Sequence, residues 1–193
     1  MPKTKPSIKK QYNEAINYIK ETKYHILAVI IIFFGSALIS FFNPDKFSFL
    51  DAFLKELVNK AAGLNLIEML LFILQNNLQS ALVGFLLGIF LGIMPLSFAL
   101  LNGLVIGYVM AIASEVQGPS VILRLIPHGI FELPAIFIAL ALGLKLGLFL
   151  FSKNAYNELK RRAYKGFIVF LTIIIPLLII AAIIESILIS LIR

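Results

Sequence analysis

The sequence has 193 residues, of which 60% are hydrophobic, and a formal net charge of +7. A soluble domain has about half of its residues apolar, and the mean hydropathy of this chain is +0.98. These values exclude an ordinary soluble protein and predict an integral membrane protein.

The first 24 residues predict a basic juxtamembrane helix. Apolar and aromatic residues recur there at helical spacing, at Ile8, Tyr12, Ile16 and Ile19. The lysines of this segment are Lys3, Lys5, Lys9, Lys10, Lys20 and Lys23. We interpret it as a helix that adheres to acidic lipid, and a docking surface for a partner protein is the alternative. No small-residue cleavage site follows the first apolar run, so we expect that run to stay in the membrane.

Five apolar stretches are long enough to cross the hydrocarbon, which needs roughly 20 residues. They predict an all-α transmembrane domain over residues 25–193, with spans at 25–42, 66–93, 95–113, 121–151 and 166–192. Gln75, Asn76 and Asn77 interrupt the second span, and Pro127 and Pro134 the fourth, so we expect broken or re-entrant helices. Residues 48–62 have one apolar and one charged helical face, which predicts an interfacial helix on the outer side.

The positions of lysine and arginine predict the orientation. One basic group precedes the first span, and a second, within residues 153–165, follows the fourth. Four crossings separate the two groups, so both should face the cytoplasm. We expect a multi-pass protein of the plasma (inner) membrane with a cytoplasmic N-terminus and an external C-terminus. Basic residues clustered beside apolar spans also argue against nucleic acid as the partner.

Three spans carry a small residue at every fourth position. These ladders are Ser80, Gly84, Gly88 and Gly92; Ala99, Gly103, Gly107 and Ala111; and Ala135, Ala139, Gly143 and Gly147. Such glycine zippers let helix backbones approach closely in lipid. We interpret them as packing faces, within one chain or between the subunits of a homo-oligomer, with a dimer as the first expectation. Asn102, beside Gly103, is assigned to the same packing.

Ionisable side chains within the spans are the most unusual feature of the sequence. Arg124, His128 and Glu132 are spaced i, i+4, i+8 and share a helix face, and Glu185 lies within about two turns of the outer end of the last span. We expect these side chains to form an intramembrane polar cluster in the outer leaflet with Asn76, Asn77 and Gln79. Because such residues are costly in hydrocarbon, the cluster is a candidate functional site.

Several chemistries remain open for this cluster. Glu132 and Glu185 could bind a cation or carry a proton. His128 and Glu132 are too few ligands for a zinc site, the chain has no cysteine, and neither an HExxH nor a Gly-x-Ser-x-Gly motif is present. We therefore expect no metal, no cofactor and no enzymatic activity. Alternatively, Glu132 pairs with Arg124 or His128 and holds broken helices together.

The polar segments together resemble the stage II sporulation protein M family. The matching segments are residues 72–77, 102–103, 128–135, 143 and 181–186. The resemblance implies a membrane scaffold rather than a hydrolase, since the family's namesake works with cell-wall-degrading partners during engulfment, and relatives occur in organisms that form no spores. We expect a non-enzymatic scaffold or assembly protein whose partners are the bilayer, a second copy and a membrane or cell-envelope protein. The alternative is a small-solute or ion transporter that uses Glu132 and Glu185.

Overall fold

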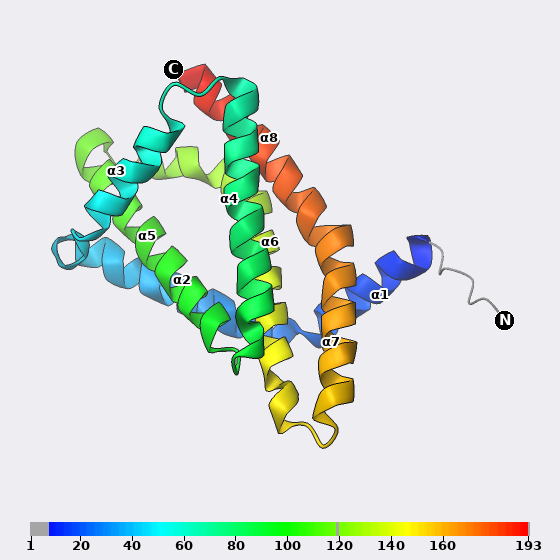
Figure 1. Ribbon diagram of the computed structural model, residues 1–193. Helices are drawn as coiled ribbons and strands as arrows, with labels where there is room; N and C mark the ends of the chain where they lie inside the picture. The colour runs from blue at the N-terminus through cyan, green and yellow to red at the C-terminus, as the bar shows by residue number, and fades with distance from the viewer. Residues whose placement is uncertain (1–7, 119, 193) are drawn as a thin grey trace.

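The fold is a bundle of helices, as Figure 1 shows for the computed structural model. The structure describes residues 8–118 and 120–192, without the side chains of residues 8, 121–128 and 192. In these ranges the regular elements are all helical, which confirms the all-α prediction. The α-helices are α1 (Ile8–Glu21), α2 (Lys23–Phe42), α3 (Leu50–Ala61), α4 (Leu66–Leu86), α5 (Ile93–Gln117), α6 (Val121–Gly147), α7 (Ala155–Val169) and α8 (Ile175–Ile192). Short 3-10 helices η1 (Pro44–Phe47), η2 (Leu87–Ile89) and η3 (Leu148–Phe151) and a π-helix η4 (Phe170–Ile174) connect them.

Five helical segments are long and apolar enough to cross a membrane, which confirms the expected number. They are Lys23–Phe42, Leu66–Ile89, Ile93–Gln117, Gly129–Phe151 and Ala155–Leu191. The last is the longest because α7, η4 and α8 run on without a turn. Pro176 lacks the backbone N–H that would bind the carbonyl of Thr172, and the π-turn at η4 adjusts the helix just before this proline.

The second and fourth spans are not broken where the sequence predicted. α4 is continuous through Gln75, Asn76 and Asn77, because amide side chains leave the backbone hydrogen bonds of a helix intact. α6 is continuous from Val121 to Gly147 through Pro127 and Pro134. Figure 1 shows that its first turns run at an angle to the rest, as expected for a helix that proline bends rather than ends.

Nearby residues explain the start of α4 and the turn that leads into α5. The Asn65 side-chain oxygen caps α4 by accepting hydrogen bonds from the backbone N–H groups of Ile67 and Glu68, both at 3.0 Å. In return, the Glu68 carboxylate accepts a hydrogen bond from the backbone N–H of Asn65 at 2.9 Å. This reciprocal capping box fixes the start of the helix. At the other end, Leu91 and Gly92 adopt φ of 56° and 72°, and this left-handed pair reverses the chain into α5.

The small-residue ladders form contacts inside this single chain. The first ladder faces the third: a Cβ on Gly88 would collide with the Gly143 backbone, and one on Gly147 with the backbones of Gly88 and Gly92. The second ladder faces α2, where Gly103 abuts Phe33 and Ser36 and Gly107 abuts Ala37 and Ser40. The Ser40 hydroxyl also donates to the Leu104 carbonyl at 2.8 Å. Two close helix pairs, α4–α6 and α2–α5, therefore organise the bundle.

Asn102 does not take part in this packing. Its side chain is exposed, and its amide donates to the Phe98 carbonyl of the same helix at 2.7 Å. Asn102 precedes the ladder residue Gly103 by one position, and neighbouring positions of a helix point about 100° apart. The polar residue therefore faces away from α2.

The helix α1 packs on α7 rather than lying free. Its buried residues are Ala15 and Tyr18, each 1% exposed, whereas Tyr12 of the predicted stripe is 51% exposed. The buried face is thus rotated from the stripe inferred from the sequence, because α7 and η4 cover it. We call residues 8–23 and 145–165, which meet at this contact, the basic end of the molecule.

Candidate functional site in an intramembrane groove

A large groove is lined by residues of α2, α4, α5, α6 and α8, and α3 lies across one end of it. Its volume is about 780 Å³. Aromatic and aliphatic side chains supply most of the lining, including Phe33 and Phe34 from α2, Leu54 and Leu57 from α3, and Phe72 from α4. A cavity with such walls suits an apolar occupant.

The polar side chains of the groove come from three helices. They are Asn76 and Asn77 of α4, Glu132 of α6 and Glu185 of α8. The sequence placed these four residues in one cluster, and the structure brings them to one cavity. Asn77 is buried, and the contact from the Asn76 Nδ2 to its Oδ1 is long, at 3.4 Å.

Glu132 and Glu185 are both half-buried inside their spans. Glu132 is three residues inside the span Gly129–Phe151, a rise of about 5 Å, and Glu185 is six residues before Leu191, a rise of about 9 Å. The two carboxyl groups line the same groove. Within the described part of the chain, neither has a basic partner.

The remaining members of the predicted cluster are placed differently. Gln79 is exposed and does not line the groove, because it follows Asn77 by two positions and so faces the other side of α4. Arg124 and His128 lie in α6, but their side chains fall outside the described residues. Pairing of Glu132 with either one therefore stays a prediction.

The groove can accept hydrogen bonds and positive charge from outside the chain. An unpaired carboxylate in hydrocarbon is costly, and it is relieved by a cation or a hydrogen-bond donor. The described residues contain no group of three or more metal-ligating side chains. Broken helices were one of the features that favoured the transport hypothesis, and the continuous α4 and α6 remove that support.

A hydrogen bond between α3 and α5 fixes α3 at the end of the groove. The Tyr108 hydroxyl donates to the Asp51 carboxylate at 2.7 Å, and Tyr108 itself is buried. Because Leu54 and Leu57 follow Asp51 by about one turn and two turns, this bond holds both leucines over the groove. The same helix leaves Phe53 and Val58 exposed.

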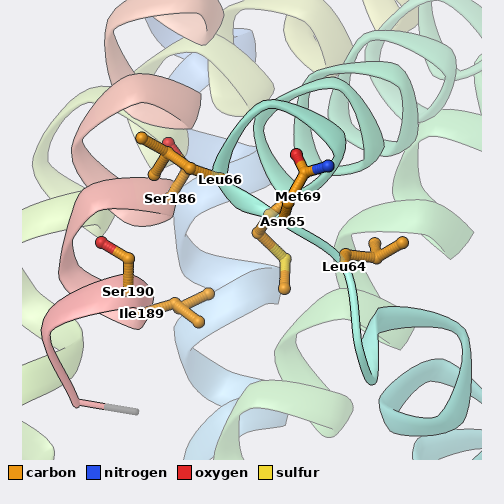
Figure 2. A pocket seen from close by; sticks show the side chains of 7 residues that line it. All are labelled: Leu64, Asn65, Leu66, Met69, Ser186, Ile189 and Ser190. Carbon is orange, nitrogen blue, oxygen red and sulfur yellow. The ribbon is translucent and has the colours of Figure 1, made fainter.

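A smaller pocket of about 200 Å³ lies between the start of α4 and the end of α8. Figure 2 shows the seven side chains that line it, among them Asn65, Ser186 and Ser190. Their side-chain oxygen atoms already have partners: the Asn65 Oδ1 caps α4, Ser186 donates to the Ile183 carbonyl at 3.0 Å, and Ser190 donates to the Ile187 carbonyl at 2.7 Å. We therefore read this pocket as a gap between helix ends.

The sequence reasoning missed Lys145, near the end of α6. Its side chain is buried, and its Nζ lies 3.2 Å from the Thr22 hydroxyl, 3.7 Å from Glu21 and 4.1 Å from the Tyr18 ring centroid. Burial raises the pKa of Tyr18 to about 12, so this ring stays neutral beneath the ammonium group. A lone lysine within an otherwise apolar span was the signal that could have drawn attention to it.

The groove lies within the part of the chain that matches a known family. Residues 23–188 match the sequence profile of stage II sporulation protein M. The chain belongs to that family. The match runs from the start of α2 almost to the end of α8 and includes Glu132 and Glu185, whereas α1 precedes it. No curated protein and no solved structure matches the chain.

Proposed function

We propose that this member of the stage II sporulation protein M family is a non-enzymatic membrane scaffold whose groove receives a transmembrane helix of a partner protein. The observation that carries the proposal is the pair of carboxylates, Glu132 and Glu185, in an apolar groove without a basic partner in the described chain. A partner helix would fill the apolar volume and bring a lysine, an arginine or an amide to the carboxylates.

The small size of the parts outside the spans supports the same reading. Apart from α1, α3 and short connections, the described chain consists of candidate spans. A partner must therefore engage mainly the membrane-embedded surface. The scaffold would act by holding that partner in place, and its role outside sporulation is not specified by the groove.

We also propose that the basic end faces the cytoplasm of a plasma (inner) membrane, with the C-terminus outside. Of the 17 lysines and arginines, 12 lie within residues 1–24 or 145–165. This asymmetry supports the orientation by the positive-inside rule.

A homodimer remains part of the proposal, but the glycine ladders do not support it. Gly88, Gly103, Gly107, Gly143 and Gly147 already contact helices of the same chain. A second copy would have to bind at another surface, because the proposal assigns the groove to the partner protein.

Site-specific photo-crosslinking in the native membrane tests the scaffold proposal. A crosslinking residue at Leu38, which lines the groove and is 57% exposed, is compared with one at Leu171, which is 60% exposed and lies outside it. We expect one defined partner at Leu38, no such adduct at Leu171, and loss of the Leu38 adduct in Glu132→Gln.

Two results would contradict the proposal. The same adducts at Leu38 and Leu171 would show that the crosslinker captures neighbouring membrane proteins at random and that the groove has no specific partner. Cation or solute flux in liposomes that disappears in Glu132→Gln, while the variant stays folded, would favour transport.

A further inference from the structure

A second charged site lies at the basic end, far along α6 from the carboxylates of the groove. Here α7 packs against both α1 and α6, and Lys145, near the end of α6, reaches Glu21 at the end of α1. Lys145 of α6 and Lys165 of α7 both approach Glu21 of α1, and both lie over the ring of Tyr18, at 4.1 and 5.2 Å from its centroid.

The arginines of this site make several hydrogen bonds within the chain. Arg161 donates twice to Glu158, at 2.9 and 2.8 Å. Arg162 donates to Glu158 at 3.0 Å, to the Lys145 carbonyl at 2.6 Å and to the Ser152 hydroxyl at 3.1 Å. These bonds fix α7 against the end of α6.

The lysines make fewer hydrogen bonds within the chain than the arginines. The distances from Lys145 and Lys165 to the Glu21 oxygens are 3.7 and 3.9 Å, beyond hydrogen-bonding length. An ammonium group has three donors; Lys145 uses one on Thr22, and Lys165 makes no hydrogen bond with another described residue. The cations Lys145, Arg161, Arg162 and Lys165 also outnumber the carboxylates Glu21 and Glu158 by two.

The surroundings place this site at the boundary of the hydrocarbon. Tyr24, Tyr156 and Tyr164 are all exposed at the basic end, and exposed tyrosines collect at the level of lipid headgroups. From the same junction, Lys23, Leu27 and Ile31 follow one another at four-residue spacing and are exposed. One face of α2 therefore passes from a cation to an apolar stripe, as a headgroup and its acyl chain would require.

We propose that the junction of α1, α6 and α7 binds an anionic phospholipid, with its phosphate at Lys165 and Lys145 and its acyl chains along Leu27 and Ile31. The phosphate accepts the free ammonium donors and offsets the excess of two positive charges. The apolar stripe of α2 is the reason to choose a lipid over a free phosphate. Because the site is separate from the groove, it does not depend on partner binding there.

Native mass spectrometry tests the proposal on the full chain in nanodiscs that contain equal amounts of dioleoyl phosphatidylglycerol and dioleoyl phosphatidylcholine. We expect phosphatidylglycerol to be retained selectively after transfer to detergent. Lys165→Gln should lower that retention about fivefold, the effect of one basic residue near an anionic lipid. Lys160→Gln is the matched control, because Lys160 is an exposed lysine of the same helix with no ion pair in the described chain.

Three results would overturn the assignment. Equal retention of the two lipids would show that the site does not recognise an anion. Equal loss in Lys165→Gln and Lys160→Gln would show diffuse attraction. Displacement of the lipid by glycerol phosphate at the same concentration would show that a free phosphate is the ligand. Circular dichroism and size-exclusion chromatography of both variants confirm that each is folded.

Discussion

The two charged regions of this molecule differ in the partners that surround their charged side chains. At the basic end, Lys145 is buried against Thr22, Glu21 and the face of Tyr18, all from the same chain. In the groove, Glu132 and Glu185 share a cavity without a basic partner in the described residues. Within the described residues, the buried cation thus has contacts in its own chain, whereas the two acids of the groove have no basic partner.

The largest expected effect is at the contact between the end of α6 and the turn that follows η2. In Gly147→Ala the new Cβ would collide with backbone atoms of Gly88, Leu91 and Gly92, which cannot rotate away. We expect a loss of about 3 kcal/mol in the free energy of unfolding, the upper range for overpacking. Unfolding in SDS, followed by circular dichroism, measures it.

Gly35→Ala is the control for that substitution. A Cβ at Gly35 of α2 meets nothing within 4 Å, so this variant should gain about 0.5–1 kcal/mol from helix propensity. Equal behaviour of the two variants would mean that the end of α6 is not in close contact with η2 and the turn before α5.

A smaller loss is expected at the basic end. Lys145→Gln removes the charge over Tyr18 and beside Glu21, and should destabilise the attachment of α1 by about 1–2 kcal/mol, because Glu21 is partly solvated. Faster hydrogen exchange confined to α1 is the expected readout. Lys153→Gln, an exposed change at the same end, should leave the exchange of α1 as it was; if both variants behave alike, the internal pairing of Lys145 has no energetic role.

The smallest change in the free energy of unfolding is expected in the groove, where the substitution should not destabilise the protein. Glu132→Gln removes a carboxylate that lines an apolar groove and has no basic partner in the described residues, so stability should stay the same or rise by up to about 1 kcal/mol. Its thermal unfolding midpoint, measured beside that of Lys145→Gln, gives the comparison directly. A loss as large as that of Lys145→Gln would show that Glu132 is paired within the chain.

Much of the architecture was predictable because a bilayer imposes a simple rule. Segments such as Lys23–Phe42 must be apolar over their whole length, so hydropathy alone locates them. The positions of Glu132, Glu185 and Asn77 in one cavity followed from depth and helical phase. The expected breaks were wrong because neither amide residues nor prolines end a helix when the hydrogen bonds on either side are kept.

Other features depend on contacts that no local pattern contains. Lys145 is joined to Thr22 across 123 positions of the chain, so its partner could not be found from spacing. Gln79 and Asn102 were misplaced because one or two positions of helical rotation decide whether a side chain faces a neighbouring helix. The groove itself follows from how far α2 and α5 stand from α8, which the sequence does not specify.

The bond between Tyr108 and Asp51 also bears on the order of assembly in the cell. It keeps α3 across one end of the groove, so a partner helix would have to arrive sideways through the bilayer rather than be threaded in from the aqueous side. The partner would then already be inserted and folded as a helix before the two proteins meet. Encounter between them becomes lateral diffusion in two dimensions, governed by how many copies of each share the same patch of membrane.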